Sequence, residues 1–210
     1  MKNVFKQLLA VLMLFGMVLN VQATPEEDLE LFQRYNQERF PNVPFQEFAN
    51  GSYSFDQAGR ENWEAIEEFP PYDPFIDSGQ EMWETPFANG KTYMECFPDG
   101  PVIAQKYPRW DKQQGMVVTL PLAINQCREA NGEKPLKYKK GDINNLLSYV
   151  AFQSRGQKTQ VEVPADDPGA LAAYEAGKKF YYTRRGQLNF SCAHCHLCLL
   201  YTSPSPRDCK

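Results

Sequence analysis

The sequence predicts a mainly helical protein of two small tandem domains, preceded by an export signal and an N-terminal arm. Three observations support this fold class. Helical patterns with capping residues recur in the second half of the chain, and strand-like alternation is rare. A Gly-Lys-x-aromatic pattern also occurs twice, each time ahead of a cysteine. The length of 210 residues suits one large domain or two small ones.

Residues 1–23 have the pattern of a cleaved export signal. Lys2 and Lys6 make the start positive, residues 8–19 form an apolar run, and residues 21–23 offer small side chains to a signal peptidase. The run is too short to cross a bilayer comfortably, so we predict a signal peptide rather than a membrane span. A retained membrane anchor is the alternative.

The composition narrows the class of partner and the fate of the cysteines. The chain has a net charge of −4 and many aromatic residues, and we identify no basic cluster, which argues against binding to nucleic acid or to an anionic membrane surface. It has six cysteines. In an exported protein, cysteines are expected to be paired, metal-bound or modified.

Residues 24–79 are rich in proline and aromatic residues. One helix is predicted there, from a cap at Asp56 through Trp63 and Ile66 to Glu68. The remainder shows no strand-like alternation, and we expect an extended arm packed by its aromatic side chains.

Two stretches of the chain resemble each other. Residues 88–93 precede Cys96 and residues 176–180 precede Cys192, each with Gly-Lys-x-aromatic on a predicted helix. The two stretches are separated in the sequence by about the length of a small domain, so their similarity favours an internal repeat. So short a match also arises by chance.

A helix with a marked start is predicted after Asp167, which can cap it, with Pro168 at the first helical position. Ala170, Ala173 and Gly177 would line one face together with Phe180. Small residues beside an aromatic one would let another helix cross closely. Alternatively, Gly177 only weakens a helix that lies on the surface.

A second helix is predicted behind Asp142, which would act as its cap. Its apolar residues fall at helical spacing: Ile143, Leu146, Leu147 and Val150. This helix would close the first small domain. The polar stretch 156–168 then reads as a linker.

The motif Cys192-x-x-Cys195-His196 carries the clearest chemistry in the chain. Cysteines three positions apart on a short helix share one face, so both thiols can reach the two vinyl groups of one porphyrin. The following histidine can then ligate the iron, which makes His196 the predicted axial ligand. His194 lies between the cysteines and should point elsewhere.

Three alternatives to haem remain open for this motif. A structural zinc ion could use Cys192, Cys195, His196 and Cys198, although zinc sites usually draw on two separated pairs of ligands. A thioredoxin-type redox pair would suit an exported disulfide oxidoreductase, but that fold needs an apolar strand just before the motif. A chance pattern without a cofactor is the third.

Cys96 and Cys127 lie in the predicted first domain, and no haem attachment motif surrounds Cys96. A disulfide is the natural fate of two such cysteines in an export compartment. It would stabilise the fold by about 3–4 kcal/mol on the chain-entropy estimate. Two free, buried thiols are the alternative.

At this point residues 50–196 resemble the SoxA family, the sulfur-oxidation c-type cytochromes of the SoxAX complex. The likeness rests on three segments: NGKTYMECFPDG, VVTLPLAINQCREANGEKPL and AYEAGKKFYYTRRGQLNFSCAHCH. The resemblance implies two tandem cytochrome c-like domains, of which only the second binds haem here. The implied organisation is a signal peptide (1–23), an arm (24–79), a haem-less domain (80–155), a linker (156–168), the start of a haem domain (169–196) and a tail (197–210).

The resemblance also implies chemistry. SoxA proteins are L-cysteine S-thiosulfotransferase subunits that pair with SoxX in the periplasm, join thiosulfate to a cysteine of the carrier SoxYZ, and pass on two electrons. One covalent haem c is expected, held by Cys192 and Cys195 with His196 on the iron. The Cys96 and Cys127 positions form a disulfide in single-haem members. A plain electron-carrying cytochrome c is the alternative within cytochromes.

The sequence departs from this family after His196. A catalytic cysteine, which also ligates the iron, is expected some tens of residues further on, yet the composition changes abruptly and resembles translated sequencing-adapter read-through. We therefore expect the chain to be truncated and residues 197–210 to be a non-native tail without a settled packed position. The 210-residue chain by itself is then expected to be inactive.

Overall fold

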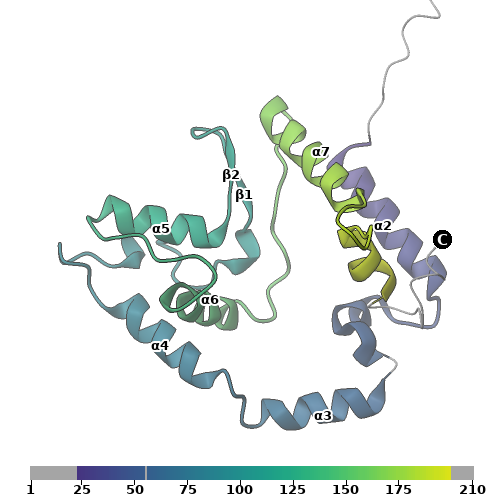
Figure 1. Cartoon of the computed structure of the whole chain (residues 1–210), viewed down its shortest axis with the longest axis horizontal. Helices are drawn as coiled ribbons and strands as arrows, with labels where there is room; N and C mark the ends of the chain where they lie inside the picture. Colours follow the sequence, from purple (N-terminus) through teal and green to yellow (C-terminus); the bar gives the residue numbers. More distant parts are fainter. Residues whose placement is uncertain (1–22, 55, 200–210) are drawn as a thin grey trace, which may run out of the picture. The chain divides into compact units, whose positions relative to one another are not determined.

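The computed structural model describes residues 23–54 and 56–199, and these are mainly helical (Figure 1). The predicted signal lies outside the described residues, except for Ala23. The chain forms two compact units, Met1–Pro41 and Asn42–Lys210. No helix of the described residues is long and apolar enough to cross a membrane.

The elements follow one another along the chain with one short hairpin among the helices. Their order is α2 (Pro25–Arg39), η1 (Phe45–Ser54), α3 (Gln57–Glu67), α4 (Asp73–Glu84), η2 (Tyr93–Glu95), η3 (Ala104–Lys106), β1 (Arg109–Asp111), β2 (Met116–Val118), α5 (Leu120–Ala130), α6 (Asp142–Gln153), α7 (Pro168–Tyr182) and η4 (His194–Leu199). Strands β1 and β2 pair in antiparallel fashion, with Trp110 opposite Val117.

The predicted extended arm is wrong for most of residues 24–79. Helix α2 opens with a capping box, in which Thr24 accepts from the Glu27 backbone N–H and the Glu27 carboxylate accepts from that of Thr24. This reciprocal pair satisfies two N–H groups that a helix start leaves unpaired. The predicted helix after Asp56 is confirmed as α3. Helix α4 was not predicted, and it crosses the predicted domain boundary at residue 80.

The core of the second unit lies where α4 and α6 pack together, with α5 and η2 beside them (Figure 1). Trp83 of α4 is 3% exposed and stacks on Tyr93 of η2 with ring centroids 5.0 Å apart. Ile143, Leu146 and Val150 of α6 are fully buried, as their helical spacing predicted. The predicted cap is wrong, since Gly141 is the N-cap and Asp142 is the first helical residue.

Gly79 of α4 is buried and lies against α6. A Cβ atom added there would lie 2.1 Å from the backbone carbonyl oxygen of Asn145 and 2.8 Å from the Cβ of Tyr149. Neither atom belongs to the flexible end of a side chain. The contact between the two helices therefore depends on the missing side chain of a single glycine.

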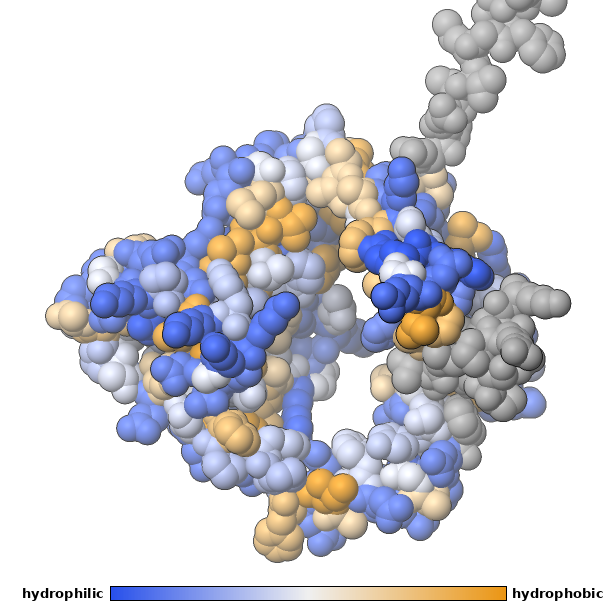
Figure 2. Space-filling view, in the orientation of Figure 1, coloured by the Kyte–Doolittle hydropathy of each residue, from blue (hydrophilic) through white to orange (hydrophobic). Residues whose placement is uncertain are grey.

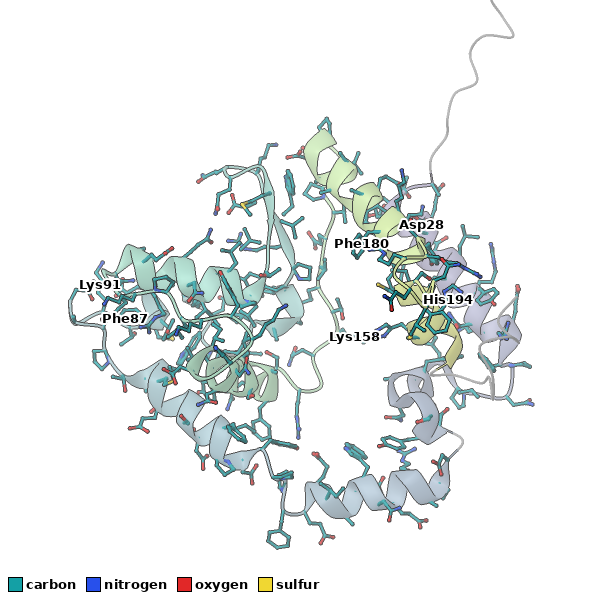
Figure 3. The ribbon with its side chains drawn as sticks, in the orientation of Figure 1. Asp28, Phe87, Lys91, Lys158, Phe180 and His194 are labelled. Atoms are coloured by element: carbon teal, nitrogen blue, oxygen red, sulfur yellow. A yellow bond between two sulfur atoms is a disulfide. The ribbon has the colours of Figure 1, made fainter. Side chains whose placement is uncertain are left out.

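The two Gly-Lys stretches do not have equivalent structures. Gly90 lies in a turn with φ +80°, in which the Phe87 backbone N–H donates to the Lys91 carbonyl oxygen and the Gly90 N–H donates to the Phe87 carbonyl oxygen (Figure 3 labels Phe87 and Lys91). Gly177, in contrast, lies inside α7. The prediction of a helix at the first stretch is wrong. The sequence similarity between the two stretches therefore has no counterpart in their local structure.

Helix α7 begins as predicted, because the Asp167 carboxylate accepts from the backbone N–H groups of Gly169 and Ala170. Its predicted packing face is only partly confirmed. Ala170 is 3% exposed, but Phe180 is 61% exposed, and a Cβ on Gly177 would meet no atom within 4 Å. Among the described residues, no helix crosses α7 at Gly177, which favours the surface-helix alternative.

Residues 154–167 connect α6 to α7 without helix or strand, and they include the predicted linker 156–168 except for Pro168, which begins α7. Part of this stretch is nevertheless fixed, since the Gln160 backbone N–H donates to the Gln105 carbonyl oxygen at 2.8 Å. At its end, the indole N–H of Trp110 donates to Asp167 at 3.0 Å. The hairpin therefore holds the start of α7.

Protonation of Asp167 at low pH should weaken its hydrogen bond with Trp110. The hydrogen bond from Trp110, ahead of the two backbone N–H groups, keeps the pKa of Asp167 below its ordinary value of 3.8. The stabilisation is therefore present above the unfolded pKa of about 3.9 and is lost as the pH falls through the lower folded pKa. The indole N–H resonance of Trp110 should shift with a midpoint below 3.8. In Asp167→Asn this titration should vanish, and its persistence there would contradict the assignment.

Candidate functional site

The predicted haem motif lies on the helical segment that follows α7. The backbone is helical from Cys192, and η4 continues as a π-helical turn from His194 to Leu199. Both cysteines of the motif are free thiols, with Cys192 half-buried and Cys195 exposed. Three positions apart on helical backbone, they present their thiols to one side of the segment.

A tight turn at residues 185–190 precedes the helical segment that carries the motif. The Arg185 backbone N–H donates to the Phe190 carbonyl oxygen at 3.0 Å, and Asn189 closes the turn onto Gly186 at 3.1 Å. Asn189 has φ +51°, which asparagine tolerates better than most residues. The guanidinium of Arg185 donates to the Phe180 carbonyl oxygen, which ties the turn to the end of α7.

The two histidines of the motif have different surroundings. His194 Nδ1 lies 2.7 Å from the Ser191 hydroxyl oxygen and accepts from the Ser191 backbone N–H at 3.2 Å. Its ring stacks on Phe190, with centroids 5.7 Å apart. His196 is exposed. The structure thus engages His194 within the protein and leaves the ring of His196 accessible to a ligand.

The residues around the motif fit a covalently attached haem. Three apolar side chains next to it are uncovered: Phe180 is 61% exposed, Leu188 77% and Phe190 37% (Figure 3 labels Phe180 and His194). A porphyrin bound through two thioethers requires apolar surface of this kind. Two free thiols, an accessible histidine and uncovered apolar side chains are therefore present on one short stretch of chain.

The alternatives for the motif gain no support from the described residues. A thioredoxin-type fold needs a strand just before the motif, but residues 183–191 contain a single isolated bridge, between Arg185 and Phe190. No group of three or more His, Cys, Asp or Glu residues in the described ranges is arranged to hold a metal ion. The side chain of Cys198, one of the four zinc ligands considered, is not described.

Cys96 and Cys127 are joined by a disulfide, which connects the end of η2 to α5. Cys127 is buried, whereas Cys96 is exposed. The Asn131 amide lies beside both sulfurs: its Nδ2 is 3.8 Å from Cys96 Sγ and 3.9 Å from Cys127 Sγ. It also donates to the Cys127 carbonyl oxygen at 2.9 Å.

Polar contacts around the disulfide were missed by the sequence reasoning. The Asn89 amide donates to Asn131 at 2.9 Å, and the Ala88 backbone N–H donates to the Glu133 carboxylate at 3.0 Å. Arg128 donates to the buried Tyr93 hydroxyl at 3.1 Å. Burial raises the pKa of Tyr93, and the hydrogen bond from Arg128 opposes this rise in part. Asparagines far apart in sequence give no signal of such a network.

Loss of the disulfide should destabilise this domain without destroying it. We expect Cys127→Ser to lower the free energy of unfolding by about 3–4 kcal/mol, because the reduced chain regains loop entropy on unfolding. Denaturant unfolding of the variant measures the loss. Peptide mapping under non-reducing conditions should recover the two cysteine peptides as one linked species. Recovery of both as free thiols from a periplasmic preparation would contradict the pairing.

The comparisons with known proteins agree with this arrangement. The family model described as "SoxA/TsdA, cytochrome c domain" matches residues 78–159, which contain the disulfide, α6 and the second half of α4. The SoxA subunit of L-cysteine S-thiosulfotransferase from Allochromatium vinosum is 62% identical over 194 residues, covering 90% of this chain and 69% of that protein. The corresponding subunit from Chlorobaculum tepidum is 45% identical, with 85% and 62% covered.

A solved structure supports the fold. The crystal structure of SoxXA from P. pantotrophus matches with a TM-score of 0.51 and 32% identity, covering 60% of this chain and 49% of that chain. Together with the helical architecture, this confirms the predicted cytochrome c-like fold class; the predicted domain bounds stay predictions. The chain thus spans about two-thirds of the length of its curated relatives. It belongs to the SoxA family of L-cysteine S-thiosulfotransferase subunits.

Proposed function

We propose that this protein is the haem c-carrying subunit of a periplasmic complex that joins thiosulfate to a cysteine of a carrier protein. One observation carries the proposal. The free thiols of Cys192 and Cys195 and the exposed ring of His196 stand on one helical segment of a chain that is 62% identical to a curated SoxA subunit. The match to the cytochrome c domain model ends at residue 159, so the proposal of one covalent haem c rests on the Cys192-x-x-Cys195-His196 motif and on the similarity to SoxA subunits.

Each residue of the motif has a separate role in this proposal. Cys192 and Cys195 would hold the porphyrin through thioethers. His196 would ligate the iron, while the ring of His194 is engaged by the Ser191 hydroxyl. When bound, the haem supplies a one-electron redox centre.

The overall reaction is an oxidation. The terminal sulfur of thiosulfate and the sulfur of the carrier cysteine form a new S–S bond, the carrier thiol loses its proton, and two electrons leave. Under this proposal the two electrons are taken up by a cytochrome c acceptor. SoxX is the proposed partner subunit and SoxYZ the proposed carrier, and the protein reaches the periplasm through its N-terminal signal.

The test is a transfer assay with the protein expressed from its genomic reading frame together with SoxX. Thiosulfate, purified SoxYZ and an oxidised cytochrome c acceptor are added. We expect the carrier to gain the mass of one thiosulfate group on its cysteine while the acceptor is reduced. A haem-loaded protein that exchanges electrons but leaves the carrier unmodified would be a plain electron carrier, which would contradict the proposal.

A further inference from the structure

The loop that joins α5 to α6 carries an unusual concentration of positive charge. We call residues 133–141 the lysine loop. It contains Lys134, Lys137, Lys139 and Lys140, and all four side chains are exposed. Among the ion pairs within the described residues, none involves these lysines. The loop thus presents uncompensated positive charge on a chain whose net charge is −4. The prediction from the composition that the chain has no basic cluster is therefore wrong for this loop.

The first half of the lysine loop is held firmly by α5. The side chain of Asn125, which is 2% exposed, accepts from the Leu136 backbone N–H at 2.8 Å and donates to the Leu136 carbonyl oxygen at 3.0 Å. Arg128 donates to the Lys134 carbonyl oxygen at 2.9 Å. A buried amide that pairs with both backbone groups of one residue fixes the loop at that point.

The second half of the loop carries backbone strain at a lysine. Lys139 has φ +67°, a conformation in which glycine or asparagine would cost less. Gly141 follows with φ +68°. Together these turns present Lys137, Tyr138, Lys139 and Lys140 to solvent, where Tyr138 is 51% exposed. In Figure 2, hydrophilic residues cover much of the face in view, including the side where α5 and α6 lie.

We infer that the lysine loop is the surface on which the carrier protein of the proposed function docks, through an acidic face of that carrier. This inference rests on the proposed function. Charge complementarity requires an acidic partner, because the loop is positive and largely lacks apolar side chains. A stable subunit interface would need an apolar centre, which the loop does not have. A carrier must leave after each transfer, and a charged surface suits such brief contacts, since it mainly speeds association.

An electron acceptor is the other brief partner of this reaction, and slower association of the loop variant with that acceptor, without any change toward SoxYZ, would overturn the inference. An anionic membrane would be repelled by the net negative charge of the rest of the chain.

A matched pair of triple variants tests this inference. The loop variant replaces Lys137, Lys139 and Lys140 by glutamine. The control variant replaces Lys91, Lys112 and Lys158 by glutamine, so both variants lose three positive charges. These three lysines are exposed and far apart in the sequence, and Figure 3 labels Lys91 and Lys158. Association with purified SoxYZ is measured directly by its on-rate, and transfer is measured by kcat and KM for the carrier.

We expect the loop variant to associate about tenfold more slowly at low salt and to raise KM for the carrier, with kcat unchanged. The difference should fade near 1 M salt, where the Debye length is about 3 Å. Equal rates for all three proteins, or equal losses in both variants, would overturn the inference. So would loop-dependent binding to anionic vesicles without any change toward SoxYZ. If transfer fails in the unmodified protein, the proposed function fails, while the on-rates still decide the docking site.

Discussion

Replacing His196 by alanine should abolish proximal ligation of the haem iron, and His194→Ala should leave the spectrum nearly unchanged. The two residues are close in the sequence but differ in their contacts. His196 is exposed and follows directly on Cys195, where it can turn under an attached porphyrin. The His194 ring is held by Ser191 and Phe190. The measurement is the absorption spectrum of each variant after expression with c-type maturation machinery.

A third variant separates ligation from local structure. Ser191→Ala removes the hydroxyl that lies 2.7 Å from His194 Nδ1, so the ring becomes freer to move, yet the haem spectrum should still depend on His196 alone. Equal spectral damage from His196→Ala and His194→Ala would count against the assignment.

Gly79→Ala should be among the most damaging single methyl additions in the described domain. The new Cβ would lie 2.1 Å from the Asn145 carbonyl oxygen, so α4 and α6 must move apart. Overpacking of this kind typically costs about 1–3 kcal/mol, and a clash with backbone should fall at the upper end. Denaturant unfolding should therefore show a loss of about 3 kcal/mol, in spite of the better helix propensity of alanine.

Gly177→Ala provides the matched control, because Gly177 is also inside a helix and its Cβ would meet nothing within 4 Å. There the substitution should stabilise by up to about 1 kcal/mol through helix propensity alone. If both variants changed stability equally, the close approach of α4 and α6 would be wrong.

The sequence could predict elements whose signals are local. The starts of α3 and α7 follow from the capping side chains of Asp56 and Asp167, and the buried face of α6 follows from its periodicity. The start of α2 also has a local signal, since Thr24 and Glu27 have the spacing of a capping box, but the proline and aromatic residues that follow it favour an extended arm.

Features that depend on tertiary contacts could not be predicted. Whether Phe180 packs against another helix is decided by what lies beside α7, and its sequence pattern did not reveal that the side chain is exposed. The stacking of Trp83 on Tyr93 joins segments on either side of a turn. Likewise, the placement of Asn131 beside the disulfide depends on how the turn at Gly90 meets α5, so the residue types alone carried no signal.

The haem motif could be predicted from its residues and their spacing alone. Only the structure shows that Ser191 contacts His194 and that His196 is exposed. The side chains that follow His196 are outside the described set. The expectations for residues 197–210 therefore stay predictions.

Covalent attachment of haem is the most direct test of the account. The protein is expressed with c-type maturation machinery in the periplasm, and its intact mass is measured under denaturing conditions. The account predicts the added mass of one haem, which peptide mapping should place on the segment with Cys192 and Cys195 and which Cys192→Ala with Cys195→Ala should remove. A protein without covalent haem, or with haem retained in the double variant, would contradict it.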